Sequence, residues 1–469
     1  MLERRTKIVA TLGPATDPPG VLDQLIAAGM DCARLNCSHG DADQLRVRAA
    51  EVRAAAERAG RPVGLLFDLQ GPKLRLAGDT AEQTLRPGEE ITFVPVGAEP
   101  GPGRVLVDFP DFARLVTERS QIVIGDGVPR LAVTALRSGE VVARAISAGP
   151  LAPRKGINVT FARPELPAIT DKDATDLELA AELGADFVAL SFVRSAADIE
   201  ELRLRLDELG SPALTVAKIE KIEAYEHLDE IVAAADGVMV ARGDYGVEAG
   251  VARVPLMQKD TIHRATQAGK LVITATQMLE SMIHAPEPTR AEATDVANAV
   301  IDGTSAVMLS AETSIGTYPV DAVRTMAEIA EAAEAAPVIH GRAGDSVPET
   351  AAGAVMHAAV GLAEELDVVA LIVPTSTGGA PRACAKYRQR RPIVAPAHES
   401  RVANQLTLEW GVYPTTMEVA GTVDELIDSA LLTAREFAGL PSGAGVVLTA
   451  GRRTGTPGAT NLIMVREIP

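Results

Sequence analysis

The sequence predicts an α/β protein in three parts: a (β/α)₈ TIM barrel, a small β-barrel inserted into it as a lid domain, and a C-terminal α/β domain. Three observations predict this. Eight short β-branched runs alternate with segments of helical length, about 100 residues rich in hairpin turns interrupt the third repeat, and a second α/β series follows residue 337. The length of 469 residues agrees with three domains of about 150 residues each.

Eight runs are the predicted barrel strands, at residues 7–11, 30–35, 63–68, 187–192, 214–219, 237–241, 271–276 and 305–309. Amphipathic stretches such as 41–59, 195–209, 255–268 and 318–335 separate them and predict helices. Eight repeats of one strand and one helix favour a closed barrel over an open sheet. We expect the barrel to occupy residues 1–70 and 168–337.

Residues 71–167 do not show the alternation of strands and helices that the rest of the barrel shows. Short apolar runs at 90–94, 104–107, 121–124 and 131–136 are separated by Pro-Gly pairs and by Asp126-Gly127, which favour hairpin turns. A β domain inserted after the third strand leaves the barrel at the carboxyl end of that strand. It is therefore expected to lie over the barrel mouth and to act as a lid.

The remaining segment, 338–469, is expected to be a separate regulatory domain. A polar, glycine-containing stretch at 339–347 precedes a helix at 349–366, a strand at 367–373, a helix at 380–387 and strands near 392 and 445.

Composition indicates a cytoplasmic globular protein. Hydrophobic residues make up 47% and charged residues 23%, and the longest apolar stretches, such as 186–193, fall far short of the ~18 residues of a membrane span. Gly13 and Pro14 interrupt any apolar region of a secretory signal. We therefore expect no membrane partner.

Charge and cysteine content narrow the function further. The net charge of −18 opposes attraction to nucleic acid, which we exclude as a partner. The three cysteines, Cys32, Cys37 and Cys384, are too few and too scattered for a disulfide scaffold or a cysteine zinc site. Reduced, mostly buried thiols are expected.

Polar side chains follow six of the predicted strands. Because the carboxyl ends of barrel strands meet at one mouth, these residues are expected to form a single site. A period of two places Arg34, Asn36 and Ser38 on one face if that strand stays extended. The residues concerned are Arg34, Asn36, Ser38, Asp68, Lys73, Arg75, Lys218, Glu220, Arg242, Gly243, Asp244, Thr274, Thr276, Ser310 and Glu312.

This cluster contains both signs of charge. Glu220 and Asp244 could supply two hard oxygens to Mg²⁺ or Mn²⁺, or they could pair with Lys218 and Arg242 as ion pairs that cap the barrel. The residues alone leave both readings open.

The cations of the cluster suit an anionic substrate. Arg34, Arg75, Lys155 and Lys218 suit phosphate or carboxylate. Neither a P-loop nor a dinucleotide-binding glycine motif occurs, so a nucleotide would have to be held between barrel rim and lid.

Long motifs from one end of the chain to the other resemble those of pyruvate kinases. They are residues 7–14 (KIVATLGP), 34–40, 68–75, 154–158, 218–220, 239–246 (MVARGDYG), 274–282 (TATQMLESM), 288–303 and 308–313. The resemblance implies transfer of the phosphoryl group of phosphoenolpyruvate to ADP, giving pyruvate and ATP in the last step of glycolysis. It also implies a homotetramer.

The resemblance also implies roles for individual residues. Glu220 and Asp244 match metal ligands, and Arg34, Lys218, Gly243, Asp244 and Thr276 match substrate contacts, with Arg34, Lys218 and Thr276 as the catalytic residues. Lys218 would stabilise the phosphoryl group in transfer and the enolate that it leaves. Nucleotide contacts match Asn36, His39, Arg75 and Lys155. The acid that protonates the enolate near Thr276 stays unassigned.

The chain differs from potassium-dependent members of the family at one position. In potassium-dependent members the positions of Asn36, Ser38, Asp68 and Leu69 hold a monovalent cation, and a glutamate stands where this chain has Lys73. The chain resembles the potassium-independent branch, and we expect the Lys73 ammonium to replace the potassium ion. A solvated lysine at the lid hinge is the alternative.

The C-terminal domain contains a loop that resembles the family's effector site. Thr375, Ser376, Thr377, Gly378 and Gly379 precede the predicted helix, where hydroxyl and backbone N–H groups could hold the phosphate of an effector. They could equally serve only to cap the helix.

Two other functions were considered. Metal-dependent barrels that cleave carbon–carbon bonds in pyruvate-like substrates also use a Glu/Asp pair on the rim. They need no ADP site, whereas the inserted domain with Lys155 favours the presence of one and therefore favours the kinase. A catalytically silent regulatory paralogue would be expected to have lost metal or phosphate ligands, and none of the matched positions is lost.

Overall fold

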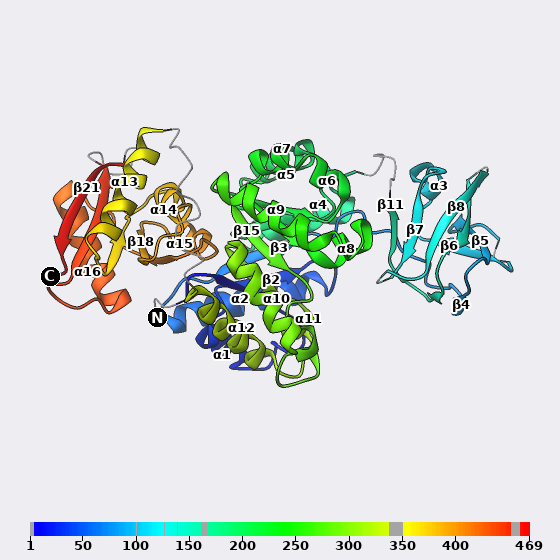
Figure 1. Cartoon of the computed structure of the whole chain (residues 1–469), viewed down its shortest axis with the longest axis horizontal. Coiled ribbons are helices and arrows are strands. Elements are labelled where there is room, and N and C mark those ends of the chain that lie inside the picture. The colour runs from blue at the N-terminus through cyan, green and yellow to red at the C-terminus, as the bar shows by residue number, and fades with distance from the viewer. Residues whose placement is uncertain are drawn as a thin grey trace.

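The computed structural model describes residues 4–99, 101–125, 127–137, 139–160, 167–336, 350–451 and 460–469. Three bodies lie in a row, with the barrel between the inserted β domain and the C-terminal domain (Figure 1). The (β/α)₈ barrel expected from the sequence is confirmed. Its eight parallel strands close in the order β1-β16-β15-β14-β13-β12-β3-β2.

Each predicted barrel run overlaps one strand of the barrel. The strands are β1 (Lys7–Thr11), β2 (Cys32–Asn36), β3 (Gly64–Asp68), β12 (Phe187–Leu190), β13 (Leu214–Ile219), β14 (Gly237–Ala241), β15 (Leu271–Ala275) and β16 (Ala306–Leu309). Val9, Met239, Ile273 and Met308 belong to one buried cluster inside the barrel, so the interior is a packed core and not a pore.

Helices surround the barrel. They are α1 (Val21–Ala28), α2 (Ala42–Ala59), α4 (Asp171–Glu182), α5 (Ala196–Glu208), α6 (Ile222–Glu226), α7 (Leu228–Ala234), α8 (Arg242–Ala249), α9 (Val254–Gln267), the 3₁₀-helix η1 (Glu280–Ile283), α10 (Arg290–Asp302), α11 (Ala311–Ser314) and α12 (Pro319–Glu334). Local sequence fixes several ends. Thr170 with Asp173, and Thr289 with Glu292, form capping boxes that start α4 and α10.

The inserted domain is a curled sheet beyond the carboxyl end of β3. Its elements are β4 (Gln83–Leu85), β5 (Glu90–Pro95), β6 (Arg104–Val107), α3 (Phe112–Leu115), β7 (Gln121–Ile124), β8 (Arg130–Arg137), β9 (Glu140–Ala145), β10 (Gly149–Leu151) and β11 (Ile157–Thr160). Six strands pair in the order β11-β7-β8-β9-β5-β6, and β10 pairs with β4. This domain has a hydrophobic core of its own, which includes Phe93 and Phe112.

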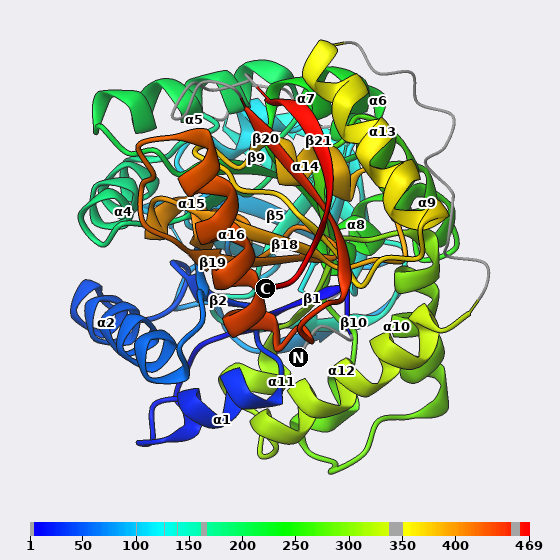
Figure 2. The ribbon, with the colours of Figure 1, turned by 90° about the vertical axis from the view of Figure 1, so that its left-hand side faces the viewer.

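The C-terminal domain is a five-stranded sheet with helices on its faces (Figure 2). Its elements are α13 (Ala351–Glu365), β17 (Ala370–Ile372), α14 (Gly379–Ala385), β18 (Ile393–Ala397), α15 (Ser400–Gln405), β19 (Val412–Thr416), α16 (Val423–Ala438), β20 (Gly445–Gly451) and β21 (Thr460–Glu467). The strand order is β19-β18-β17-β20-β21, and β21 runs antiparallel to β20.

The C-terminal domain packs against the amino end of the barrel. Trp410 belongs to the same buried cluster as barrel residues, and the Arg388 guanidinium donates to the Gly303 carbonyl at 2.7 Å. The expected boundary at 337/338 and the residues 161–166 before the boundary at 167/168 lie outside the described residues.

Other sequence expectations can be compared directly. All three cysteines are buried and free of disulfides, as expected. Across the described parts of the chain, no helix combines the length and apolarity that a bilayer crossing requires.

Candidate active site at the barrel mouth

A buried carboxylate, Asp68, joins two cations at the carboxyl end of the barrel. The Arg34 Nε donates to Asp68 Oδ2 at 2.7 Å, and the Lys218 Nζ lies 3.1 Å from Asp68 Oδ1. Lys218 also lies 3.0 Å from Glu220 Oε1. Arg34 and Lys218 are 9% exposed, and the two carboxylates are 1% exposed. Four residues that the sequence placed at the ends of three strands are therefore in direct contact.

The opposite charges in this cluster stabilise the ionised forms of Asp68 and Lys218. Burial alone would raise the pKa of Asp68, but the charges of Lys218 and Arg34 hold it below its ordinary value. Burial opposes the charge of Lys218, yet Asp68 and Glu220 raise its pKa well above the ordinary value. Lys218 therefore keeps its charge at neutral pH, before any substrate binds.

The loop after β12 positions Lys218 and Glu220. Lys218 Nζ donates to Ser191 Oγ at 2.6 Å, and Ser191 Oγ donates to the Leu69 carbonyl at 2.7 Å. The Phe192 N–H donates to Glu220 Oε2 at 3.0 Å, and Phe192 adopts a left-handed backbone with φ of 57°. Our sequence reasoning missed Ser191 as a site residue. The sequence did contain a signal for Ser191, because a hydroxyl residue directly after a buried strand lies at the carboxyl end of that strand.

A second group of contacts fixes Thr276 after β15. Thr276 Oγ1 accepts from the Gly243 N–H at 2.8 Å and donates to the Ala275 carbonyl at 2.7 Å. The Arg242 Nη2 donates to the Thr276 carbonyl at 2.7 Å, and its Nη1 pairs with Asp295 of α10. These bonds hold Thr276 at φ of 68°, in the left-handed region that a β-branched residue rarely adopts.

The ion pairs differ from the capping pattern that the sequence left open. Glu220 does pair with Lys218, but Arg242 pairs with Asp295 and not with Asp244. The Asp244 side chain makes no hydrogen bond or ion pair within the described ranges. It lies in the first turn of α8, half-buried, and it lines a cleft under the lid.

Glu220 and Asp244 fit a divalent cation. Burial raises the pKa of Glu220, Lys218 lowers it, and the negative charge of Asp244 raises it further. The two carboxylates are therefore close enough to repel each other, and a cation between them would relieve that repulsion. No group of three or more His, Cys, Asp and Glu ligands occurs in the described part of the chain. Such an ion would complete its shell with water and substrate oxygens.

A cleft of about 580 Å³ runs between the lid and the barrel. Lys73, Arg75, Phe192 and Asp244 are among its lining residues. Burial and then the positive charges of Lys73, Arg75 and Arg34 lower the pKa of His39, so these cations face the same region. The cleft thus leads from Asp244 at the barrel mouth to the basic residues Lys73 and Arg75.

The comparisons with known proteins cover almost the whole chain. The family models "Pyruvate kinase, barrel domain" and "Pyruvate kinase, alpha/beta domain" match residues 3–323 and 353–466. The chain belongs to the pyruvate kinase family. It is 42% identical to a pyruvate kinase of Geobacillus stearothermophilus, over the full chain and 81% of that relative. Identity is 42% to a pyruvate kinase of Mycobacterium tuberculosis and 41% to one of Mycobacterium intracellulare, in both cases over the full chain and 99% of the relative.

Family membership confirms the function expected from the sequence. The chain is a phosphotransferase, a pyruvate kinase that transfers the phosphoryl group of phosphoenolpyruvate to ADP in the last step of glycolysis. The carbon–carbon lyase considered above is thereby set aside.

Of the four predicted nucleotide contacts, Arg75 lines the cleft, and the other three lie on the barrel and in the inserted domain. Asn36 ends β2, and the exposed His39 follows in the adjoining turn. Arg75 forms an isolated bridge with Gly156 and donates to the Arg154 carbonyl at 3.3 Å. A side chain at Gly125 would meet Lys155 Cδ at 3.1 Å, so Lys155 lies across that glycine.

The structure differs from the sequence expectation at Ser38 and agrees with the expected position of the loop 375–379. Ser38 does not continue the face of Arg34 and Asn36, because β2 ends at Asn36 and the Ser38 N–H donates to Asn36 Oδ1 at 3.1 Å in a turn. The effector-like loop follows β17 as expected. There Thr375 Oγ1 accepts from the Gly378 N–H at 2.9 Å, a bond that orders the entry to α14.

Proposed function

We propose that phosphoryl transfer in this chain takes place at the Arg34–Asp68–Lys218–Glu220 cluster, with ADP held in the cleft under the lid. One observation carries the proposal: the Arg34 guanidinium contacts one carboxylate oxygen of the buried Asp68, and the Lys218 ammonium contacts the other. A transferring phosphoryl group spreads negative charge over its oxygens, and positioned cations stabilise that charge.

Arg34 and Lys218 have the groups to bind the phosphate of phosphoenolpyruvate. Gly243 and Thr276 would lie at the carboxylate end of the substrate, where the N–H and the hydroxyl would exchange their present acceptors for carboxylate oxygens. Lys218 would then stabilise the enolate oxygen after transfer, because its pKa is raised and it stays charged. The donor of the proton to the enolate carbon is not assigned.

Glu220 and Asp244 would hold Mg²⁺ or Mn²⁺. When bound, the ion would supply positive charge that neutralises the negative charge of the substrate. Glu220 is oriented for this by the Phe192 N–H, which occupies Oε2 and leaves Oε1 toward Lys218.

The nucleotide would be bound by Asn36 and His39 from the barrel and by Arg75 and Lys155 from the lid side. The lowered pKa of His39, caused by burial and then by Lys73, Arg75 and Arg34, supports a neutral ring next to a basic rim. A neutral imidazole can accept a hydrogen bond from a ribose or base, while the cations meet the phosphates.

The monovalent-cation region would be served by Lys73 instead of potassium. Lys73 is exposed, lines the cleft, and its side chain makes no hydrogen bond or ion pair among the described residues. The charge of Lys73 nevertheless lowers the pKa of His39, which follows Asn36 and Ser38 in the chain. The fourth residue of the region, Asp68, already bonds Arg34 and Lys218.

Three further features are proposed from the family. The chain would assemble as a homotetramer, act in the cytoplasm, and bind a phosphorylated effector at Thr375, Ser376, Thr377, Gly378 and Gly379. The hydroxyl of Thr375 serves the loop itself, and helix capping remains the competing role.

The test is pyruvate formation from phosphoenolpyruvate, with and without ADP, Mg²⁺ and potassium. Activity that requires ADP and Mg²⁺ supports the proposal, and activation by potassium would remove the role of Lys73. Lys218→Met should lower kcat about 10²- to 10³-fold. Lys259→Met, which removes a surface lysine paired with Asp302, is the matched control. Equal loss in both variants would contradict the assignment of Lys218.

A further inference from the structure

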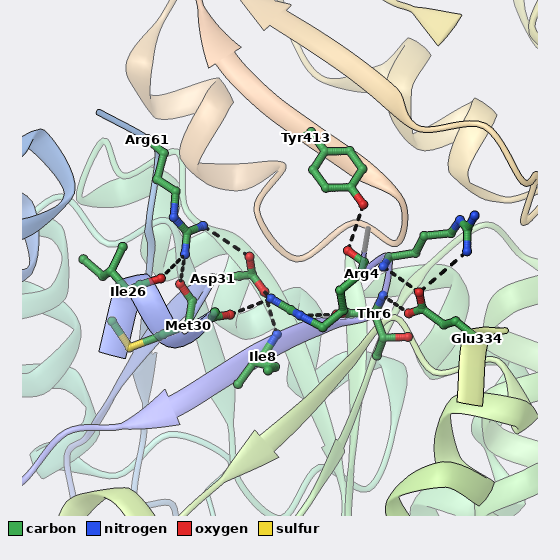
Figure 3. Close-up of polar contacts among 11 residues, drawn as sticks. Arg4, Thr6, Ile8, Ile26, Met30, Asp31, Arg61, Glu334 and Tyr413 are labelled. Carbon is green, nitrogen blue, oxygen red and sulfur yellow. Dashed lines mark hydrogen bonds and ion pairs between the residues drawn. The ribbon is translucent and has the colours of Figure 1, made fainter. Parts of the chain in front are cut away.

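The barrel is joined to its two neighbouring domains in different ways. At the amino end, the Tyr413 hydroxyl of the C-terminal domain donates to the Arg4 carbonyl at 2.8 Å, and Arg4 Nη2 donates to Asp31 at 2.9 Å (Figure 3). At the carboxyl end, the inserted domain faces the barrel across the cleft of about 580 Å³. The side chains that cross this boundary, together with the two connecting segments, therefore determine how the lid is held.

Lys221 connects the lid to helix α8. Its Nζ donates to Asn158 Oδ1 of β11 at 3.1 Å and pairs with Glu248 Oε2 of α8 at 3.3 Å. In Figure 1, α8 lies on the side of the barrel that faces the inserted domain. The ammonium of Lys221 thus stands between a lid strand and a barrel helix. We call the contact of these three side chains the lid link.

The ion pair of the lid link is buried on the barrel side. The side chain of Glu248 is 1% exposed, and that of Lys221 is 17% exposed. Burial raises the pKa of Glu248, the charge of Lys221 lowers it, and the charge of Glu223 raises it. A buried carboxylate that loses its cation is costly, so the ion pair holds Lys221 in one orientation toward the lid.

A second lid residue contacts the same helix. Arg130 Nη2 of β8 donates to the Val247 carbonyl at 3.5 Å. Val247 lies in the last turn of α8, where carbonyls find no N–H donor further along the helix, and a cation there compensates the helix dipole. The lid thus contacts α8 directly at Val247 and through Lys221 at the next residue, Glu248.

The other end of α8 belongs to the candidate active site. Gly243 and Asp244 lie in its first turn, and the Gly243 N–H donates to Thr276 Oγ1 at 2.8 Å. The helix has eight residues, so its ends are about 12 Å apart and it moves as one unit. In addition, Lys221 directly follows Glu220 in the chain. A change in how the lid is held therefore acts on both proposed metal ligands.

We propose that Lys221 is a positioning residue for phosphoryl transfer, because it holds the lid over the cleft and holds α8, with Asp244, at the barrel mouth. It acts through other residues, since Asn158 and Glu248 already occupy its ammonium. The effect on the metal rests on the proposed role of Asp244, whereas the effect on the lid does not. Loss of the link should weaken binding of Mg²⁺ and ADP and leave the rate at saturation nearly unchanged.

The first test measures the lid itself, in the full chain without substrates. Spin labels at Arg119→Cys in the lid and Asp207→Cys after the exposed end of α5 report the distance between the two bodies, because both positions are exposed and the three native cysteines are buried. Lys221→Met and Asn158→Ala should each broaden the distance distribution, and Lys259→Met should leave it like that of the parent. Asn158→Ala keeps the buried ion pair, so it decides the question alone if Lys221→Met does not fold. Unchanged distributions overturn the proposal.

The second test is kinetic. In Lys221→Met and Asn158→Ala, the concentrations of ADP and Mg²⁺ for half-maximal activity should rise about tenfold, while kcat falls less than about threefold. Lys221→Arg keeps the charge and should restore most of the loss. The double variant should be no worse than Lys221→Met alone, because both changes break one contact. Additive losses, or a lower kcat with unchanged half-saturating concentrations, overturn the proposal.

Asp244→Asn separates this proposal from the proposed metal site. If Asp244→Asn has the Mg²⁺ dependence of the parent, the metal role of Asp244 is overturned, and the lid distances alone decide the role of Lys221. If Asp244→Asn needs more Mg²⁺ while Lys221→Met does not, the metal site stands and the coupling through Lys221 is overturned.

Discussion

Replacing Lys7 by methionine should stabilise the ligand-free protein, although it removes a buried lysine. Burial lowers the pKa of Lys7 from 10.5 to about 8, against the opposing charge of Asp31. The lowered value means that the native fold holds this proton less tightly than the unfolded chain does. At neutral pH both states are protonated, and the native state bears the full cost of the charge.

The magnitude follows from the two pKa values. Their difference corresponds to about 3 kcal/mol, because each pKa unit is equivalent to about 1.4 kcal/mol. The Lys7 Nζ lies 4.3 Å from the centroid of the Tyr413 ring. Loss of this cation–π contact should offset about 1 kcal/mol of the gain. The expected gain in unfolding free energy for Lys7→Met is therefore about 2 kcal/mol at pH 7.

The pH dependence gives the sharper test. As pH rises from about 8 toward 10.5, the native state loses the proton before the unfolded state does, so the parent gains stability and the methionine variant does not. Urea unfolding of both proteins at several values between pH 7 and 9.5 measures the difference, with Lys259→Met as the control for loss of a lysine. A variant less stable than its parent at pH 7, or a difference that does not shrink toward alkaline pH, would refute the reasoning.

Four further outcomes are expected. Asp68→Asn should destabilise the fold by about 3–5 kcal/mol in urea unfolding, because it leaves two buried cations without their shared carboxylate; a loss below 1 kcal/mol would show that the two cations relax to other partners. Since the pKa of Asp68 is lowered, its contribution is present at neutral pH and is lost as pH falls below about 4. Glu220→Gln should raise the Mg²⁺ concentration needed for half-maximal activity at least tenfold, while an unchanged Mg²⁺ titration would exclude it as a ligand. Lys73→Glu should create a requirement for potassium, measured as the ratio of rates with and without the ion, and a ratio near one would leave Lys73 a solvated residue.

The barrel was predictable because its strands are buried on both faces. Such strands read as continuous apolar runs, and all eight were found. The lid strand β9, which carries charges at Glu140 and Arg144, was not predicted, and neither was the half-exposed β21, although it contains the apolar run 462–465. The amphipathic α16 was missed as well, although its capping box of Thr422 and Glu425 is a local signal.

For the site, the sequence identified which residues reach the mouth but not how they pair. Arg34, Asp68, Lys218 and Glu220 stand at strand ends, where the topology brings them together. The partner of Arg242 is Asp295, on a helix 53 positions further along the chain. That choice depends on how α10 packs against the barrel, and no local pattern encodes it.

The strand β1 runs from the amino end of the barrel to the active site. Lys7 begins it, and Thr11 ends it with a side-chain oxygen that accepts from Arg34 Nη1 at 2.9 Å. Five residues of strand cover only about 13 to 17 Å, and two neighbouring strands hold this backbone in register. A displacement of β1 along its axis would therefore reach the guanidinium of Arg34 through the strand backbone and one hydrogen bond, without passing through the lid.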